Sequence, residues 1–417
     1  MEIKRDLYLD RLIQRKHNGL VKIITGIRRC GKSYLLRKLF KDHLLTQGVP
    51  SDHIIEMAFD IFENEKYQDP NVFNPWANSR IVDDKMHYFL LDEVQLLKKF
   101  EFVLNGLAYK PNTDVYVTGS NAKFLSKDII TEFGGRGDEI HIYPLSFREF
   151  MSAYDGSPYD GWKEYILYGG LPTVVLEKNS EQKVNILNHL LKETYLSDIL
   201  KRNKLKNIGE MEELMSILAS SIGSLTNPNK LQKTFKSVKH SRITSSTITK
   251  YLNCLEDSFL IESAKRYDIK GKNYIETPLK YYYTDLGLRN AQINFRQLEV
   301  PHSMENIIYN TLKVRQFNVD VGIVPVNQRN EKNIPIRKQL EVDFVCNKAS
   351  KRYYIQSAYL LPDEEKTEKE ARSLRQISDS FKKIIITTDS PAPHYNEEGI
   401  LILNIYDFLL KPEIIDF

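Results

Sequence analysis

Hydrophobic residues in the first 150 positions form short continuous runs separated by segments of helical spacing. The runs at 21–25, 54–59, 87–91, 114–118 and 139–142 predict buried strands. In the segments between them, apolar residues recur every three or four positions, as in Leu35, Leu36, Leu39 and Phe40, which predicts amphipathic helices. Strands that alternate with helices are typical of a doubly wound parallel sheet. We therefore expect an α/β fold here.

The pattern changes twice farther along the chain. Residues 151–200 have helical spacing and predict a lid of helices. Residues 208–285 predict helices at 208–222 and 229–238, a third capped by Ser245 or Ser246, and then a two-stranded wing, which is the order of a winged helix. Residues 302–417 return to mixed helices and strands. A chain of 417 residues suggests two or three domains, and we place them at 1–200, 201–295 and 296–417.

The segment after the first predicted strand carries the clearest chemistry. This phosphate loop, residues 26–33, reads Gly26-Ile27-Arg28-Arg29-Cys30-Gly31-Lys32-Ser33. Its glycines let backbone N–H groups turn toward phosphate oxygens, and the following helix adds its positive end. Lys32 would contact the β- and γ-phosphates of ATP, and Ser33 would ligate Mg²⁺. Arg28 and Arg29 would either reinforce anion binding or face solvent.

An acidic pair supplies the other half of such a site. The apolar run 87–91 ends in Asp92-Glu93, as a buried parallel strand does when it delivers a carboxylate to a sheet edge. Asp92 would hold Mg²⁺ through water, and Glu93 would polarise the attacking water. The sequence therefore predicts Mg²⁺-dependent ATP hydrolysis rather than binding alone.

Six motifs in order resemble those of a known family. They are Gly-Ile-Arg-Arg-Cys-Gly-Lys-Ser (26–33), Leu-Leu-Asp-Glu-Val-Gln (90–95), Thr-Gly-Ser-Asn (118–121), Gly-Gly-Arg-Gly-Asp-Glu-Ile (134–140), Pro-Leu-Ser-Phe-Arg-Glu-Phe (144–150) and Tyr-Gly-Gly-Leu-Pro (168–172). Together they resemble the prokaryotic ATPases of the AAA+ superfamily that carry a C-terminal domain of unknown function. The resemblance covers the whole chain.

This resemblance implies roles for further residues. Ser120 or Asn121 would be a sensor residue beside the γ-phosphate, although a turn with Asn121 as a helix cap explains the composition equally well. Arg136 would be an arginine finger that acts from a neighbouring subunit, which calls for a homo-oligomer. The alternative for Arg136 is a surface arginine in a loop, since the family often has a second arginine where this chain has Gly134. Pro172 would pack near the nucleotide.

Basic residues are concentrated in the middle of the chain. The net charge is +4, yet residues 201–290 hold 16 Lys or Arg against 9 Asp or Glu, a difference of +7. One predicted helical face carries Lys230, Lys233, Lys236, Lys239 and Arg242, and the next helix would expose Thr247, Thr249, Lys250 and Asn253. We expect DNA to bind through 230–250 and the wing. The alternative is that this region docks a protein.

Other features indicate a cytoplasmic protein without membrane association. The 3 cysteines, Cys30, Cys254 and Cys346, lie far apart and suggest neither disulfides nor a zinc site. The charged N-terminal sequence does not resemble a signal segment, and no apolar run has the length of a membrane span.

The last 116 residues resemble the core of a PD-(D/E)XK nuclease. The resemblance implies a helix acid at Glu305, with Asp343 and Gln356 at the metal positions and Ala358 where the family has its lysine. Lys366 and Lys369 are the alternatives for that lysine. Because alanine cannot position a water nucleophile, we expect a degenerate fold that serves binding or assembly. An ATP-gated nuclease and a slow nucleotide switch that docks a protein are the alternatives to a DNA-coupled ATPase.

Overall fold

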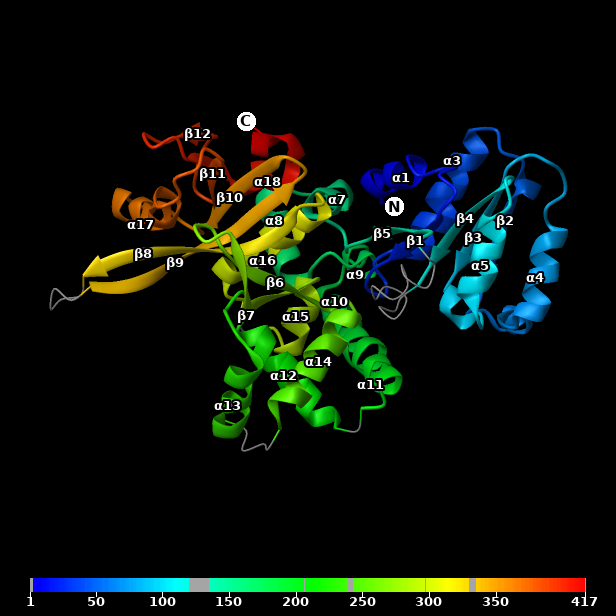
Figure 1. The fold of residues 1–417 in the computed structure, drawn as a ribbon, viewed down its shortest axis with the longest axis horizontal. Helices are drawn as coiled ribbons and strands as arrows, with labels where there is room; N and C mark the ends of the chain where they lie inside the picture. Colours follow the sequence, from blue (N-terminus) through cyan, green and yellow to red (C-terminus); the bar gives the residue numbers. More distant parts are fainter. Residues whose placement is uncertain are drawn as a thin grey trace. The chain divides into compact units, whose positions relative to one another are not determined.

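The computed structural model forms two compact units (Figure 1) and describes residues 3–119, 135–205, 207–238, 243–296, 298–329 and 335–416. Unit 1 comprises Met1–Pro144, Leu171–Thr173 and Leu255–Leu260. Unit 2 comprises Leu145–Gly170, Val174–Cys254 and Ile261–Phe417. No helix in the described ranges is both long enough and apolar enough to cross a membrane.

A five-stranded parallel sheet forms the centre of unit 1, as the sequence predicts. Its strands lie in the order β2-β3-β4-β1-β5, and every neighbouring pair is parallel. Their bounds are Val21–Thr25 (β1), Ile54–Ala58 (β2), His87–Asp92 (β3), Thr113–Thr118 (β4) and Gly137–His141 (β5). Every residue of β1, β3 and β4 is buried, which explains why their sequences are continuous apolar runs.

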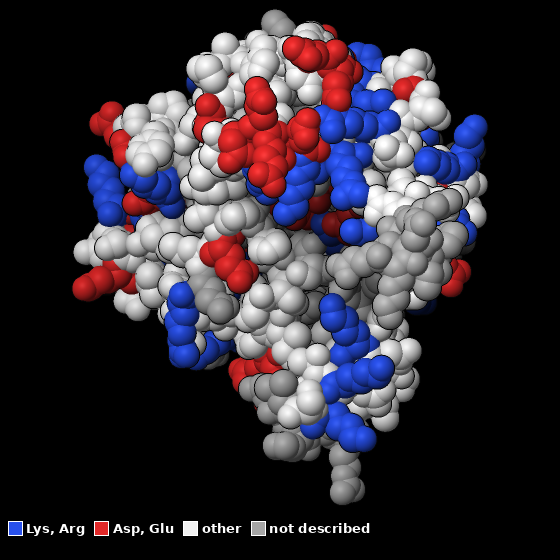
Figure 2. All heavy atoms as spheres, turned by 90° about the vertical axis from the view of Figure 1, so that its left-hand side faces the viewer, with Lys and Arg blue, Asp and Glu red and all other residues white. Residues whose placement is uncertain are grey.

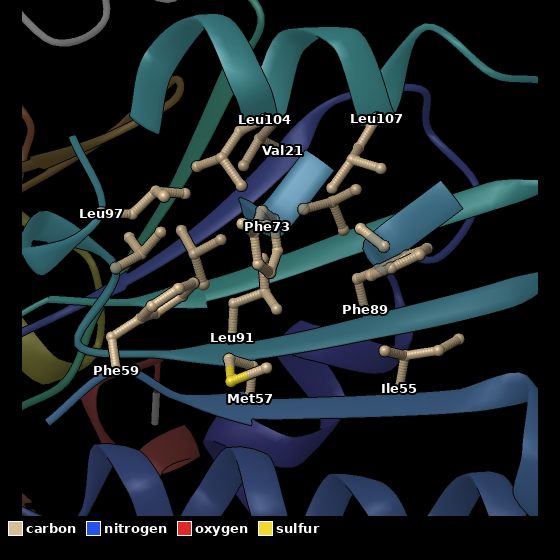
Figure 3. Close-up of a cluster of buried hydrophobic side chains, with 14 of the residues drawn as sticks. Val21, Ile55, Met57, Phe59, Phe73, Phe89, Leu91, Leu97, Leu104 and Leu107 are labelled. Atoms are coloured by element: carbon tan, nitrogen blue, oxygen red, sulfur yellow. The ribbon is translucent and has the colours of Figure 1, made fainter. Parts of the chain in front are cut away.

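Helices cover both faces of this sheet. On one face, alternate strand residues pack against α4 (Pro70–Ser79) and α5 (Phe100–Ala108). Figure 3 shows this cluster, with Leu104 and Leu107 of α5 directed toward the strands. The other face receives Phe40, whose ring centroid lies 4.5 Å from that of Tyr116. The remaining elements of unit 1 are α1 (Asp6–Ile13), α2 (Lys32–Tyr34), η1 (Leu35–Phe40), α3 (Lys41–Thr46), η2 (Ser51–His53), η3 (Phe62–Gln68) and η4 (Val94–Leu96).

Helices make up the first part of unit 2. Those at 147–203 agree with the helical spacing predicted for 151–200 and are α7 (Phe147–Ala153), α8 (Pro158–Tyr168), α9 (Pro172–Val175, shared with unit 1), α10 (Ser180–His189), η6 (Leu190–Leu196) and α11 (Ser197–Asn203). The next helices lie where the sequence predicts a three-helix group and are α12 (Ile208–Ser220), α13 (Pro228–Val238) and α14 (Ser245–Asp257). They are followed by α15 (Leu286–Gln292).

An eight-stranded mixed sheet occupies the rest of unit 2, in the order β12-β13-β11-β10-β9-β8-β6-β7. Its strands are β6 (Ile261–Asp268), β7 (Asn273–Tyr283), β8 (Asn318–Arg329), β9 (Pro335–Lys348), β10 (Lys351–Ser357), β11 (Lys382–Thr387), β12 (His394–Tyr395) and β13 (Leu401–Asn404). The accompanying helices are α16 (Val300–Val314), α17 (Glu364–Arg375), α18 (Ile405–Leu410) and η7 (Pro412–Asp416).

The expected wing strands belong to this larger sheet. β6 and β7 form the antiparallel hairpin that the sequence predicts, but β6 also pairs with β8, with Arg266 opposite Val321 (Figure 1). The hairpin is therefore continuous with strands that were expected in a separate domain. The compact units accordingly do not follow the expected boundaries at 201 and 296.

Candidate nucleotide-binding site

The phosphate loop follows β1 directly and requires glycine at two positions. Gly26 has φ +137°, and a Cβ there would lie 2.1 Å from the carbonyl oxygen of Ile142. Gly31 has φ +101°, a conformation that other residues rarely adopt. The fixed glycines of the motif are thus explained by the path of the loop and by its close approach to the segment after β5.

Lys32 is held inside the loop. Its side chain is buried, and its Nζ donates to the carbonyl oxygens of Gly26 at 2.8 Å and Ile27 at 3.1 Å. The ammonium therefore points back across the loop, where the backbone N–H groups of such a turn gather anions. Its expected contact with the β- and γ-phosphates stays a prediction.

The two predicted Mg²⁺ ligands lie side by side. The Oδ1 atom of Asp92 accepts hydrogen bonds from Ser33 Oγ, at 3.0 Å, and from Thr118 Oγ1. Asp92 ends β3 and is buried, and this burial raises the pKa of its carboxyl, while the hydrogen bonds from Thr118 and Ser33 act in the opposite direction. A hydroxyl and a carboxylate that meet at one point fit a hard cation such as Mg²⁺.

Glu93 is held in position by its backbone conformation and by hydrogen bonds to two neighbouring side chains. Its φ is +54°, in the left-handed region that non-glycine residues seldom adopt. Its backbone N–H donates to Thr118 Oγ1 at 3.0 Å, and its carboxylate accepts a hydrogen bond from the Gln95 amide. Because Thr118 also donates to Asp92, one hydroxyl at the end of β4 fixes the positions of both acids.

Arg5 holds the loop from outside it. Its guanidinium is buried and donates to the carbonyl oxygens of Cys30, at 3.0 Å, and Tyr143, at 2.8 Å. Pro172 also lies close, since a Cβ on Gly31 would be 3.8 Å from its Cγ. The sequence had pointed to Pro172 through the family resemblance, but Arg5 carries no local signal because its partners are 25 and 138 residues away.

The other predicted site residues are placed as follows. Ile27 and Cys30 are buried in the loop, whereas Arg28 is half-buried and Arg29 is exposed. Ser120 and Asn121, the expected sensor residues, lie outside the described residues. Arg136 is exposed and immediately precedes β5, where its carbonyl accepts the N–H of Val21.

That register puts Arg136 at the edge of the sheet opposite the phosphate loop. β5 is parallel to β1, and Val21, the first residue of β1, lies opposite Gly137. Strand β1 runs from Val21 to Thr25, and these four residue-to-residue steps span about 13 Å between this edge and the end of β1 where the loop begins. The backbone of Arg136 therefore lies at the opposite end of β1 from the loop of its own chain, so we expect a role as a finger to involve a second subunit.

A second group of potential ligands does not form a metal centre. Among the described residues, His53, Asp83 and His87 are the group of three such side chains whose donor atoms lie close together. The two imidazole rings stack with centroids 4.3 Å apart, and His53 Nε2 lies 3.4 Å from Asp83 Oδ2. His87 Nε2 also accepts the backbone N–H of Val82 at 3.1 Å. We interpret this group as a structural stack.

Comparison with known proteins identifies an AAA domain in the first part of the chain. Residues 18–151 match the family model for an AAA domain, and 159–299 match a domain of unknown function. An uncharacterized protein of Haemophilus influenzae is 35% identical over 420 residues, covering 98% of this chain and 99% of that protein. The uncharacterized protein MJ1544 of Methanocaldococcus jannaschii is 27% identical over 434 residues, covering 100% of this chain and 90% of its own.

Solved structures show only slight similarity. The Aeropyrum pernix ORC1 protein in complex with DNA has 12% identity and a TM-score of 0.29, covering 70% of this chain and 93% of its own. The phosphate loop and Asp92 both lie within the matched AAA region. The chain therefore belongs to the same family as the Haemophilus influenzae protein, and it contains an AAA-type ATPase domain.

Proposed function

We propose that the chain hydrolyses ATP with Mg²⁺ at the phosphate loop and that its nucleotide state controls binding to DNA. The observation that carries the first half is the hydrogen-bonded set of Ser33, Asp92, Thr118 and Glu93. This set supports a proposal in which Ser33 and Asp92 hold the metal ion and Glu93 serves as the general base.

Each side chain has a defined task in this proposal. Mg²⁺, when bound with ATP, would neutralise negative charge on the phosphates. Ser33 and Asp92 would hold the ion, and Lys32 would exchange its carbonyl partners for phosphate oxygens. Glu93 would accept the proton of the attacking water once the Gln95 amide releases its carboxylate. Thr118 and Arg5 would keep the acids and the loop in register.

The direct test is ATP turnover by the full-length chain in Mg²⁺, with and without duplex DNA. We expect phosphate release that requires Mg²⁺ and changes when DNA is added. Tight nucleotide binding without measurable turnover would favour the slow switch that docks a protein. Turnover that does not change when DNA is added would support ATP hydrolysis and contradict its coupling to DNA.

The DNA proposal depends on the exposed faces of α13 and α14. On α13, Lys230, Lys233 and Lys236 are exposed while Leu231 and Phe235 are buried. The exposed face of the following helix is polar and consists of Ser246, Thr249, Lys250 and Asn253. Figure 2 shows mainly Lys and Arg among the charged side chains at its lower end, the part of unit 2 where α13 lies. A basic face beside a polar helix supports contacts with phosphates. Lys239 and Arg242 lie outside the described residues.

Removing the basic face should weaken DNA binding uniformly. We expect the change of Lys230, Lys233, Lys236 and Lys239 to alanine to lower affinity for all duplex sequences alike. The slope of log affinity against log salt should flatten by about one for each phosphate that the variant no longer neutralises. Fluorescence anisotropy of labelled duplexes across a salt series measures both quantities.

A charge-matched control separates direct phosphate binding from general electrostatics. Lys85, Lys98, Lys163 and Lys178 are exposed and lie outside α13 and α14. Their change to alanine should leave the salt slope unchanged. If the α13 variant kept full affinity and slope, the basic face would instead be assigned to docking a protein.

Arg136 should act on a neighbouring subunit. We expect Arg136→Ala to lower turnover by at least about tenfold without weakening ATP affinity, because an arginine finger stabilises charge that develops in the transition state. Turnover per wild-type chain should rise with protein concentration. Arg296→Ala, at another exposed arginine, is the control and should have no effect.

Mixed assemblies make this test specific. Arg136→Ala chains retain an intact loop, and Lys32→Ala chains retain the finger, so a mixture should recover activity that neither variant has alone. A mixture that stayed inactive, with turnover per chain independent of dilution, would show that Arg136 is an ordinary surface residue.

A further inference from the structure

A buried lysine lies at the centre of the acids that the nuclease resemblance had singled out. Lys280 of β7 is surrounded by Glu305 of α16 and by Glu341 and Asp343 of β9. Its Nζ lies 2.8 Å from Glu305 Oε1, 2.8 Å from Glu341 Oε1 and 3.4 Å from Asp343 Oδ1. The side chains of Lys280, Glu305 and Asp343 are each at least nine-tenths buried. An ammonium has three N–H donors, and here three carboxylate oxygens face them.

Neighbouring groups also contact the acids of this cluster. The Tyr282 hydroxyl donates to Glu305 Oε1 at 2.7 Å, and the backbone N–H of Ser357 donates to Asp343 Oδ2 at 2.9 Å. The side-chain carbonyl of Gln356 accepts the backbone N–H of Asp343 at 3.4 Å. Gln356 is thus directed at the backbone of β9.

The charges fit one resident cation. Burial alone would lower the pKa of Lys280, but the three carboxylates outweigh it and raise that pKa, so the ammonium stays charged. Burial raises the pKa of Glu305 to about 7, although Lys280 opposes the shift.

A divalent ion at Asp343 and Gln356, which the nuclease resemblance implies, does not fit these residues. An ion at coordination distance from the same carboxylates would share their centre with the ammonium and be repelled by it. The carboxylates are spread around Lys280, and they do not form a group of three ligands within 4.8 Å of one another among the described residues. Gln356 is already committed to the backbone.

The expected replacements for the missing lysine are elsewhere. Ala358 is buried in an apolar cluster with Val345 and Leu374, so a lysine there would enter a hydrophobic core. Lys366 pairs with Glu370 on its own helix, 2.5 Å away, and Lys369 of the same helix is exposed. The cation beside the acids comes instead from β7, which the sequence had assigned to a different domain.

We propose that the ammonium of Lys280 is the built-in cation of this site and takes the place of a divalent metal. It joins β7, α16 and β9 by charge, so this sheet is held together without metal. The site is consequently closed to the metal chemistry that a nuclease uses.

Terbium luminescence can test this assignment in the full-length chain. Tb³⁺ binds carboxylates and emits when a nearby tyrosine is excited, and Tyr282 is in contact with Glu305. Wild-type emission should not depend on Asp343→Asn. Lys280→Met should gain one bound ion per chain, and adding Asp343→Asn should abolish that gain. Lys183→Met is the control, because Lys183 is a mostly buried lysine paired with the single carboxylate of Glu164, and it should gain no ion.

Two results would overturn the proposal. One is wild-type Tb³⁺ or Mn²⁺ binding that Asp343→Asn removes, since the ion would then coexist with Lys280 or displace it. The other is a folded Lys280→Met chain that gains no ion. If Lys280→Met fails to fold, the comparison of wild type with Asp343→Asn still decides, because any ion bound at the cluster must be lost with Asp343.

Discussion

Replacing Lys32 with alanine is expected to abolish ATP binding at ordinary nucleotide concentrations. The ammonium is buried in the loop, where it donates to two backbone carbonyls, and in the proposed function it contacts the β- and γ-phosphates. Charge-assisted hydrogen bonds contribute about 1.5–3 kcal/mol each, so losing two of them should weaken binding at least about a hundredfold. Titration with a fluorescent ATP analogue measures the change.

Lys38→Ala is the matched control for this variant. Lys38 lies on the same helical run as Lys32, with 57% of its side chain exposed, and pairs with Asp42. The Lys38→Ala variant should bind ATP with the affinity of the wild type. The carbonyls of Gly26 and Ile27 lose their hydrogen-bond partner in Lys32→Ala. A melting curve of each variant shows whether the chain still folds. A stable Lys32→Ala chain with wild-type affinity would contradict the assigned site.

Changing Glu93 to glutamine is expected to stop turnover and leave ATP affinity nearly unchanged. An amide matches the shape of the carboxylate but cannot accept a proton from water. Loss of a general base typically costs about 10²–10⁴-fold in rate. Phosphate release under saturating ATP, measured beside the binding titration, separates the chemical step from binding.

Gln95→Ala tests whether Glu93 must be released before it acts. This change removes the amide that holds the Glu93 carboxylate and leaves the base in place. Turnover should therefore persist in Gln95→Ala while it disappears in Glu93→Gln. Hydrolysis at the wild-type rate by Glu93→Gln would show that another group activates the water.

The strands of unit 1 and the phosphate loop could be predicted because their signals are local. A continuous apolar run such as 87–91 reports burial on both faces, and the loop motif is contiguous. Thr118 was placed correctly at a strand end, yet its bridging of Asp92 and Glu93 follows from β4 lying between β1 and β3. Strand order is a property of the whole sheet that no segment encodes alone.

Errors arose where distant segments meet. A hairpin such as β6 and β7 has the same alternation of apolar and polar residues whether it ends a small domain or continues a larger sheet. Its pairing with β8 therefore could not be predicted from the sequence pattern. Lys280 is likewise not predictable from the residues around Ala358, because only the shared sheet brings β7 beside Glu305 and Asp343. Arg136 shows a related limit, because only the register of β5 on β1 reveals which edge of the sheet it occupies.

Arg5 bears on how this ATPase domain is delimited. Sequence similarity to AAA domains begins at residue 18, but the guanidinium that ties Cys30 of the phosphate loop to Tyr143 comes from residue 5. A fragment that began at residue 18 would keep every motif residue but would lose the buried side chain of Arg5. The functional boundary of the domain is therefore set by Arg5, which holds the loop, and it lies upstream of the recognisable motifs.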